Sequence, residues 1–580
     1  MASAQSRLGT EQATVPRIVL PIRSGGLELT DRLCWAILGA AMVVAAALIL
    51  YLNRGTVFFV DELERFVDSP TLGPVDVIEP HAGHLTAISN LVYKAILETV
   101  GAHYLAFRLL IVSCVLLTTG LFYALVKRRI GALPALAPAL VLLFFGSSWQ
   151  MIITGLGFNV VFSIAMGLGA LLALDRGGRL GDALACVLLV VSVSTLSIGL
   201  AFLVGVAVSV LLGSDRRRAW IFLVPLTLYA VWWLWGQSAA EPAGLGASAS
   251  NVLLIPSYIA ESLAAVLSSL AGLSFEFSPE TTEGAVTQSG IVLAILATVA
   301  LALRIRQGSV PRFLWVSLAI VLAFWTLSAL ARNEFRPPGQ IRYLYTGAVG
   351  VLLVAAAAAS GIRFSRAGVT ILFAVAALSL ATNLVLLRDG AREFRNAYSA
   401  PLRANLAMLE LGRDDIRPGF NPRAGVQALS ISSLSAAEYL TASDRYGSLA
   451  FSLPELANQP EPIRERADRT LARSLGIELA PFHSRAGARE CELIRSGGLS
   501  GEIAFLLPPG GATLTTRGDA PGELTVGRFA SAATVGLGAL EPGRSAMLRI
   551  PTDSSPTPWR ASVTGPSALE ACSAPPPSAG

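Results

Sequence analysis

The chain has 580 residues, of which 53% are hydrophobic and only 14% are charged, and its mean hydropathy is +0.61. A soluble protein of this length would carry about 25% charged residues, so the composition excludes an ordinary soluble enzyme. The formal net charge is only +5 and no basic face is interleaved with aromatic residues, so no nucleic-acid partner is expected. The two lysines, Lys94 and Lys127, lie outside any G-x-x-x-x-G-K-[ST] pattern, which excludes an ATP motor of the P-loop type.

Composition changes once along the chain, near residue 388. Residues 1–32 are expected to form a cytoplasmic tail, and 33–387 an α-helical polytopic membrane domain. Residues 388–489 are expected to form an extracytoplasmic helical segment. From 490 to 580, short β-like runs are split by Gly and Pro, which predicts a β-sandwich with a disordered tail. The fold class is therefore a polytopic helical domain followed by an extracytoplasmic α+β domain.

Apolar blocks about 20 residues long predict eleven membrane spans. The predicted spans are 33–52, 105–126, 132–148, 156–175, 181–196, 197–213, 219–236, 289–303, 313–331, 343–360 and 369–387. The breaks on one side, with the N-terminal tail, carry seventeen Lys and Arg, against six on the other side. The positive-inside rule then puts the N-terminus in the cytoplasm and the C-terminal domain outside, in a multi-pass protein of a bacterial cytoplasmic membrane.

Segment 251–273 is apolar enough to insert, but both of its flanks lack Arg and Lys. The stretch 274–283 that follows is acidic, and a crossing helix would place it in the cytoplasm and invert every later loop. We therefore interpret 251–273 as an interfacial or re-entrant helix on the outer face.

The outer loop 53–104 between the first two spans carries the most chemical information. Asp61 and Glu62 directly follow Val-Phe-Phe-Val, where the chain leaves the bilayer. A carboxylate at that boundary is partly desolvated, so its pKa can be tuned for catalysis, and both residues are candidate catalytic groups. Glu64 and Asp68, four residues apart, fit a solvated polar helix face instead.

The same loop contains Glu79-Pro-His81-Ala-Gly-His84. His and carboxylate side chains at such spacing can hold a divalent cation, so Asp61, Glu79, His81 and His84 form a candidate Mg or Mn site. The alternatives are that one His caps or stacks locally, or that His81 and His84 contact substrate.

These features resemble the GT-C superfamily of polytopic glycosyltransferases. The resemblance rests on Asp61-Glu62 just after the first span, the 53–104 loop, the span topology and the domain order, over about residues 30–390. It implies a polyprenyl-phosphate sugar donor, a glycan or lipid acceptor in the cell envelope, and transfer on the outer face of the bilayer. The next outer loop, 147–159, lacks the second acid that many members carry.

Residues at other span ends are candidate substrate contacts. Three arginines crowd one short outer loop and could hold a lipid phosphate: Arg332, Arg336 and Arg342, with Tyr343 beside them. The mouth of the third and fourth spans offers an aromatic ring and two amides for a sugar: Trp149, Gln150 and Asn159. The alternative for all of these is ordinary snorkelling and an interfacial aromatic belt.

Two of the five cysteines, Cys491 and Cys572, lie in the C-terminal domain and bracket its β-rich stretch. Oxidation is possible outside the cytoplasm, so we expect one disulfide that joins the ends of the sandwich. The alternative is two unpaired thiols, with Cys572 in a disordered tail.

The expected function is a membrane hexosyl- or pentosyltransferase. A transporter or flippase of lipid-linked sugars is the first alternative, but an ion-coupled carrier would need ionisable groups near mid-membrane, and the predicted spans hold almost none. A non-catalytic carbohydrate-binding surface protein is the second alternative.

Overall fold

The structure is a computed structural model that describes residues 31–573 except 214, 240–248, 275–286, 309, 332–336, 423–433, 483–490, 497–500, 518, 552 and 554. The chain forms two compact units. The first unit contains residues up to 52, 75–89 and 108–391, and the second contains 53–74, 90–107 and 392–580. Most of the outer loop therefore folds with the C-terminal region, whereas the sequence placed it within the membrane domain.

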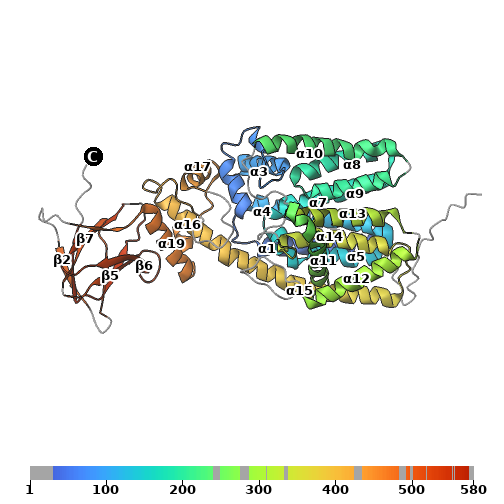
Figure 1. Cartoon of the computed structure of the whole chain (residues 1–580). Coiled ribbons are helices and arrows are strands. Elements are labelled where there is room, and N and C mark those ends of the chain that lie inside the picture. The colour runs from blue at the N-terminus through green and yellow to red at the C-terminus, as the bar shows by residue number, and fades with distance from the viewer. Residues whose placement is uncertain are drawn as a thin grey trace, which may run out of the picture. The chain divides into compact units, whose positions relative to one another are not determined.

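Apolar helices make up the first unit (Figure 1). Their bounds are α1 (Asp31–Leu52), α4 (Tyr104–Ile130), α5 (Ala132–Leu143), α6 (Trp149–Ile153), α7 (Leu156–Arg176), α8 (Gly178–Thr195), α9 (Gly199–Leu211), α10 (Trp220–Ala239), α11 (Ile255–Leu270), α12 (Gln288–Arg306), α13 (Arg312–Leu330), α14 (Ile341–Ala358) and α15 (Arg366–Glu393). A helix rises about 1.5 Å per residue, so about 20 residues cross the hydrocarbon core. Among the described residues, eleven helical segments satisfy length and hydropathy, and the chain is a multi-pass membrane protein.

Those eleven segments include Ser250–Leu270 and leave out the shorter α9. Contacts at the helix ends decide which of the two crosses the bundle. Asn251 Nδ2 donates to the Leu330 carbonyl at the end of α13 (3.0 Å), and the Ser268 hydroxyl lies 2.7 Å from that of Thr287, just before α12. Because α12 and α13 are joined by a short connection at their other ends, both ends of α11 lie at the same end of the bundle. This agrees with the prediction of an interfacial or re-entrant helix. If α9 takes its place, eleven helices again run from one end of the bundle to the other.

The basic breaks gather at the opposite end of the first unit. There Lys127 bonds Asp31 (2.8 Å), Arg129 bonds Asp175 (2.7 Å) and Arg218 bonds Asp182 (2.5 Å). At the same end Arg304 Nε donates to the Ala358 carbonyl that ends α14 (3.0 Å). The alternation of helix directions expected from the sequence is therefore present in the bundle.

The second unit joins helices to a β-sandwich. Its helices are α2 (Val60–Asp68), most of α3 (Ala87–Val100), a π-helix (Phe394–Ser399), α16 (Ala400–Leu411), α17 (Ala436–Tyr446), α18 (Leu453–Ala457) and α19 (Glu461–Leu475). Its strands are β1 (Leu479–Pro481), β2 (Cys491–Arg495), β3 (Glu502–Leu506), β4 (Gly510–Arg517), β5 (Gly522–Gly527), β6 (Val535–Leu540), β7 (Ser545–Ile550), β8 (Arg560–Thr564) and β9 (Ala568–Ser573).

The predicted sandwich is confirmed. A five-stranded sheet has the order β1-β7-β4-β9-β2, and a four-stranded sheet has the order β3-β8-β5-β6. Leu514 and Leu548 of the first sheet share one buried cluster with Leu524 of the second, and Met408 of α16 and Leu471 of α19 join that cluster. The sandwich thus begins at β1, inside the range expected to be helical, and shares its core with two helices.

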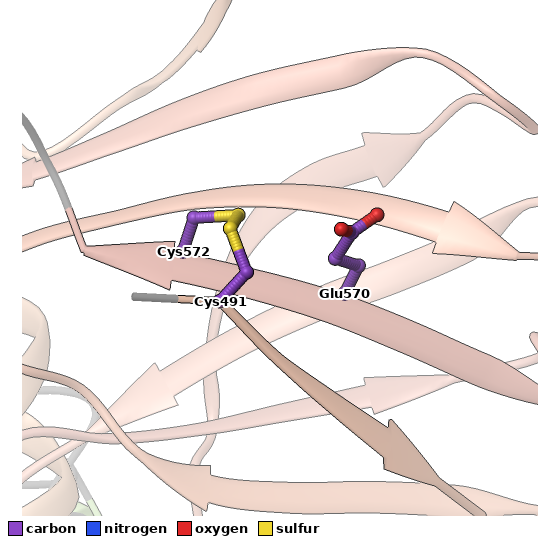
Figure 2. Close-up of side chains that lie close together, drawn as sticks. All are labelled: Cys491, Glu570 and Cys572. Carbon is purple, nitrogen blue, oxygen red and sulfur yellow. A yellow bond between two sulfur atoms is a disulfide. The ribbon is translucent and has the colours of Figure 1, made fainter. Parts of the chain in front are cut away.

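The predicted disulfide is also present. Cys491 and Cys572 lie opposite each other on the antiparallel pair β2 and β9, and their sulfur atoms are bonded (Figure 2). Glu570 lies two residues before Cys572 on β9 and pairs with Arg517 of β4. The bond closes a separation of 81 residues and joins the edge strand β2 to its neighbour.

Candidate functional site

The acidic turn, residues 57–62, leads from the first span into α2. The carboxylate of Glu62 is fully buried and accepts hydrogen bonds from the Phe59 N–H (3.0 Å), the Tyr93 hydroxyl (3.0 Å) and the Tyr104 hydroxyl (3.4 Å). The first N–H groups of a helix have no partner inside the helix, and a carboxylate three positions in can satisfy one of them. Burial and the adjacent Glu62 raise the pKa of Tyr93, so its phenol stays a donor.

The rest of α2 divides into a buried and an exposed face. Arg65 is buried, donates from Nε to Asn90 (3.2 Å) and lies over the ring of Tyr93 (5.5 Å). Asp61, one turn before Arg65, is half-buried, and Asp68, at the end of the helix, is exposed. The neighbours Asp61 and Glu62 therefore have different environments, because only Glu62 lies inside the fold.

Contacts with α17 fix the loop within the second unit. Glu98 of α3 accepts from Tyr446 (2.9 Å) and Arg445 (2.8 Å), and these two donors hold the pKa of Glu98 below its usual range, with the Tyr446 bond contributing most. Gly101, at φ +66°, lies against the Tyr446 carbonyl, where a Cβ would collide. The acidic turn is thus part of a folded body that includes C-terminal helices.

The two histidines form a tight hairpin in the first unit. His81 and His84 exchange backbone hydrogen bonds (3.0 and 2.9 Å), and Ala82 and Gly83 between them both have positive φ. This is the two-residue turn in which both central residues are left-handed. Directly opposed residues on an antiparallel pair share a face, so the two imidazoles project from the same side of the hairpin.

The histidine hairpin is fixed to the ends of the α8–α10 helices, which run alongside one another in Figure 1. His84 Nδ1 lies 2.9 Å from the Ser197 hydroxyl, which lies 3.1 Å from the Tyr229 hydroxyl. Just before the hairpin, the Ile78 carbonyl accepts from Trp232 Nε1 (2.7 Å). A ring nitrogen that makes such a hydrogen bond fixes the orientation of its imidazole.

The candidate metal ligands are divided between the two units. Asp61 belongs to the second unit, and His81, His84 and the exposed Glu79 belong to the first. Within either unit taken alone, the only described group of three potential ligands is Cys491, Glu570 and Cys572, whose sulfurs are in the disulfide. Neither unit by itself fits the expected Mg or Mn ion, so that site stays a prediction.

The candidate phosphate-binding loop is described in part. Arg332 and Arg336 lie outside the described residues. Arg342, in the first turn of α14, is half-buried, donates from Nε to Gln340 (2.7 Å) and lies over the ring of Tyr343 (5.3 Å). The guanidinium is therefore held at the end of the bundle opposite the basic breaks.

The residues at the mouth of the third and fourth spans are inside the bundle. Trp149, Gln150 and Asn159 are all buried. The Trp149 ring packs against Gly390 of α15, where any Cβ would collide with it. Close packing with α15 accounts for this tryptophan, and its contact with a sugar remains a prediction.

Sequence reasoning missed several residues that shape the acidic turn, among them Tyr93 and Tyr398. The Tyr398 hydroxyl accepts from the Val60 N–H (3.0 Å) although the two residues are 338 positions apart. Tyr398 follows the last span in a polar stretch, and no local pattern links it to the first loop. Arg65 lies on the polar side of α2 by its position in the helix, so the sequence did not distinguish it from the solvated acids Glu64 and Asp68.

No protein-family model matches the chain, and neither does any curated protein. Among solved structures, apo ArnT from Cupriavidus metallidurans is similar at 12% identity, over 67% of this chain and 82% of that one, with a TM-score of 0.42. The same protein bound to undecaprenyl phosphate is similar at 13% identity, over 70% of this chain and 84% of that one, with a TM-score of 0.41. The arabinosyltransferase EmbB from Mycobacterium smegmatis is similar at 12% identity, over 97% of this chain and 66% of that one, with a TM-score of 0.35. Likenesses this weak assign no role to any residue of this chain.

Proposed function

We propose that the chain is a membrane glycosyltransferase that transfers a sugar from a polyprenyl-phosphate donor to a glycan or lipid acceptor of the cell envelope. The observation that carries the proposal is the acidic turn. Directly after the first span, one carboxylate is buried as a structural acceptor, and its neighbour Asp61 is held half-exposed on a rigid helix. A fixed, half-buried carboxylate at the end of a span is suited to take a proton from a substrate delivered by the lipid phase.

In the proposed reaction, the acceptor hydroxyl attacks the anomeric carbon of the donor and its proton passes to the Asp61 carboxylate. The bond between that carbon and the phosphate oxygen breaks, and the polyprenyl phosphate leaves with the electron pair. The leaving phosphate is an anion, and a guanidinium can bind it in a bidentate manner. We assign that role to Arg342 and, in the same loop, to Arg332 and Arg336.

The remaining candidates would bind substrate. We assign contacts with sugar or acceptor hydroxyls to His81 and His84, because the hairpin presents both imidazoles on one side and Ser197 orients one of them. We propose no step that depends on the predicted Mg or Mn ion. We also propose that the N-terminus is cytoplasmic and that the acidic turn faces the outside, since the basic breaks gather at the opposite end of the bundle.

The donor class is tested with the purified full chain in lipid nanodiscs. Radiolabelled polyprenyl-phosphate sugars and nucleotide sugars are supplied in parallel with a cell-envelope extract as acceptor. We expect labelled product and stoichiometric release of polyprenyl phosphate from a lipid-linked donor only. Turnover of nucleotide sugars alone, or movement of the lipid-linked sugar between leaflets without its cleavage, would exclude the proposal and favour another transferase or a flippase.

A further inference from the structure

The π-helix Phe394–Ser399 follows α15 directly and leads into α16. A π-helix is rare and often occurs at functional sites, and its wider turn brings residues four and five positions apart onto one face. Phe394, Tyr398 and Ser399 have this spacing, and all three are buried. The π-helix therefore presents two hydroxyl groups and two aromatic rings to the interior of the second unit.

The partner of this face is the acidic turn. The Val57 N–H donates to Ser399 Oγ (3.3 Å) and the Val60 N–H donates to Tyr398 Oη (3.0 Å). Phe59 lies between Val57 and Val60 in the sequence, and its ring packs against Phe394 (5.3 Å between centroids) and Tyr398 (4.8 Å). Backbone and side chain of the turn are thus held by one face of the π-helix.

The two hydrogen bonds serve backbone groups that α2 itself cannot satisfy. Val60 is the first residue of α2 and Asp61 the second, so the Val60 N–H has no acceptor within the helix. Glu62 takes the Phe59 N–H, and Tyr398 takes the next one along the chain. The N–H groups of Phe59 and Val60, the two residues before Asp61, are therefore both held by side chains.

We infer that Tyr398 and Ser399 are positioning residues for Asp61. The inference rests on the proposed function, because it concerns the geometry of the proposed base. A displacement of about 1 Å at a reacting group can cost about 100-fold in rate, and the π-helix fixes the main chain at the residue that precedes Asp61. The hydroxyls act through the backbone and do not contact substrate.

The segment that carries these hydroxyls continues into α16, whose Ala404 and Met408 belong to the core of the β-sandwich. The position of the base therefore depends on a C-terminal region that has no local sequence relation to it. This dependence gives the C-terminal region a role in the reaction besides any carbohydrate binding.

The test compares two tyrosine variants in the full chain. Tyr398→Phe removes the acceptor of the Val60 N–H. Tyr439→Phe is the matched control, because Tyr439 is also buried in the second unit and donates to Glu410 (2.6 Å), but it makes no hydrogen bond to the acidic turn. Ser399→Ala is a milder variant, since the bond that it removes is the longer of the two.

Hydrogen exchange of the peptide that covers residues 57–62 is the first readout. Loss of a buried partner should speed exchange there by about 5- to 150-fold in Tyr398→Phe, and the Tyr439→Phe control should leave that peptide unchanged. The second readout separates kcat from KM for the lipid donor. We expect kcat to fall at least about tenfold in Tyr398→Phe with KM unchanged, and Tyr439→Phe to keep both constants at a temperature where each variant is folded.

Unchanged exchange in Tyr398→Phe, or an equal loss of kcat in both variants, would overturn the inference. Failure of the proposed function looks different. In that case Asp61→Asn transfers sugar as well as the wild type, or the wild type transfers none, and the positioning role of Tyr398 in the reaction is excluded with it. The exchange readout then still decides whether Tyr398 holds the turn.

Discussion

The acidic turn and the histidine hairpin lie about 20 residues apart in one loop, yet different means hold them in place. The hairpin is closed by its own backbone and then anchored by one imidazole to Ser197. The acidic turn is held by side chains from α3 and from the π-helix, more than 300 residues later. The hydrogen bonds that close the hairpin are local, whereas the acidic turn depends on the folded C-terminal region.

Removing the disulfide should produce the largest difference in stability between the acidic turn and the histidine hairpin. The closed loop spans 81 residues, and chain entropy gives about 4 kcal/mol of stabilisation for such a loop. The Cys491→Ser/Cys572→Ser variant should lower the unfolding temperature of the second unit and speed exchange at residues 57–62. Exchange in the hairpin, residues 81–84, should not change. Equal acceleration in both turns would show that they are not independent.

Glu62→Gln should weaken the acidic turn through its interior. The amide has one acceptor oxygen where the carboxylate has two, and its NH₂ group would face donors, so we expect a loss of about 1–3 kcal/mol. Thermal unfolding followed by circular dichroism measures this loss. Asp68→Asn changes an exposed acid of the same helix and should stay within about 0.5 kcal/mol of the wild type. Equal stability of Glu62→Gln and the wild type would show that the buried carboxylate is dispensable.

Gly83→Val should disturb only the histidine hairpin. Gly83 has φ +79°, and a β-branched residue in that conformation costs about 1–2 kcal/mol. Hydrogen exchange should accelerate at residues 81–84 and stay unchanged at 57–62, the reverse of the disulfide variant. A change in both peptides would contradict the separate anchoring of the two turns.

Ser197→Ala should have the smallest effect. It removes one hydroxyl between His84 and Tyr229, and such a bond contributes about 1 kcal/mol. The hairpin backbone should remain closed, because its own two hydrogen bonds do not involve Ser197. The NMR signal of His84 labelled with ¹⁵N should shift with the loss of the Nδ1 partner, and an unchanged signal would exclude this contact in solution.

Much of the fold could be predicted because local sequence patterns, such as hydropathy and the placement of Arg, determine it. Hydropathy and Arg placement located the long apolar helices, and the lack of basic flanks marked 251–273 as interfacial or re-entrant. All five β-like runs that the sequence marks, at 502–507, 512–516, 523–526, 546–550 and 559–563, contain strands, and the positions of Cys491 and Cys572 indicated the disulfide between them. The pattern missed β6, whose Val-Gly-Leu-Gly-Ala-Leu sequence contains two glycines, because glycine is disfavoured in strands.

The candidate site could be predicted only in part. Proximity to a span end marked Asp61 and Glu62 together, but the sequence could not separate them, since the difference arises from Tyr93 and Tyr104 folding over one of the two. In the same way, Trp149 was a candidate sugar contact because it is an aromatic residue beside an amide at a span end, yet its ring packs on Gly390. Long-range packing decides such cases, and no periodicity along the chain records it.

The most direct test of the central claim is single-turnover sugar transfer by the wild type, Asp61→Asn and Asp68→Asn in nanodiscs. Both variants lose one acid from α2, and only Asp61 is the proposed base. Removal of a general base costs about 10²–10⁴-fold, so Asp61→Asn should lose transfer by that factor while folding as the wild type does. Asp68→Asn should transfer at the wild-type rate. Transfer at the wild-type rate by Asp61→Asn would contradict the assignment of the base.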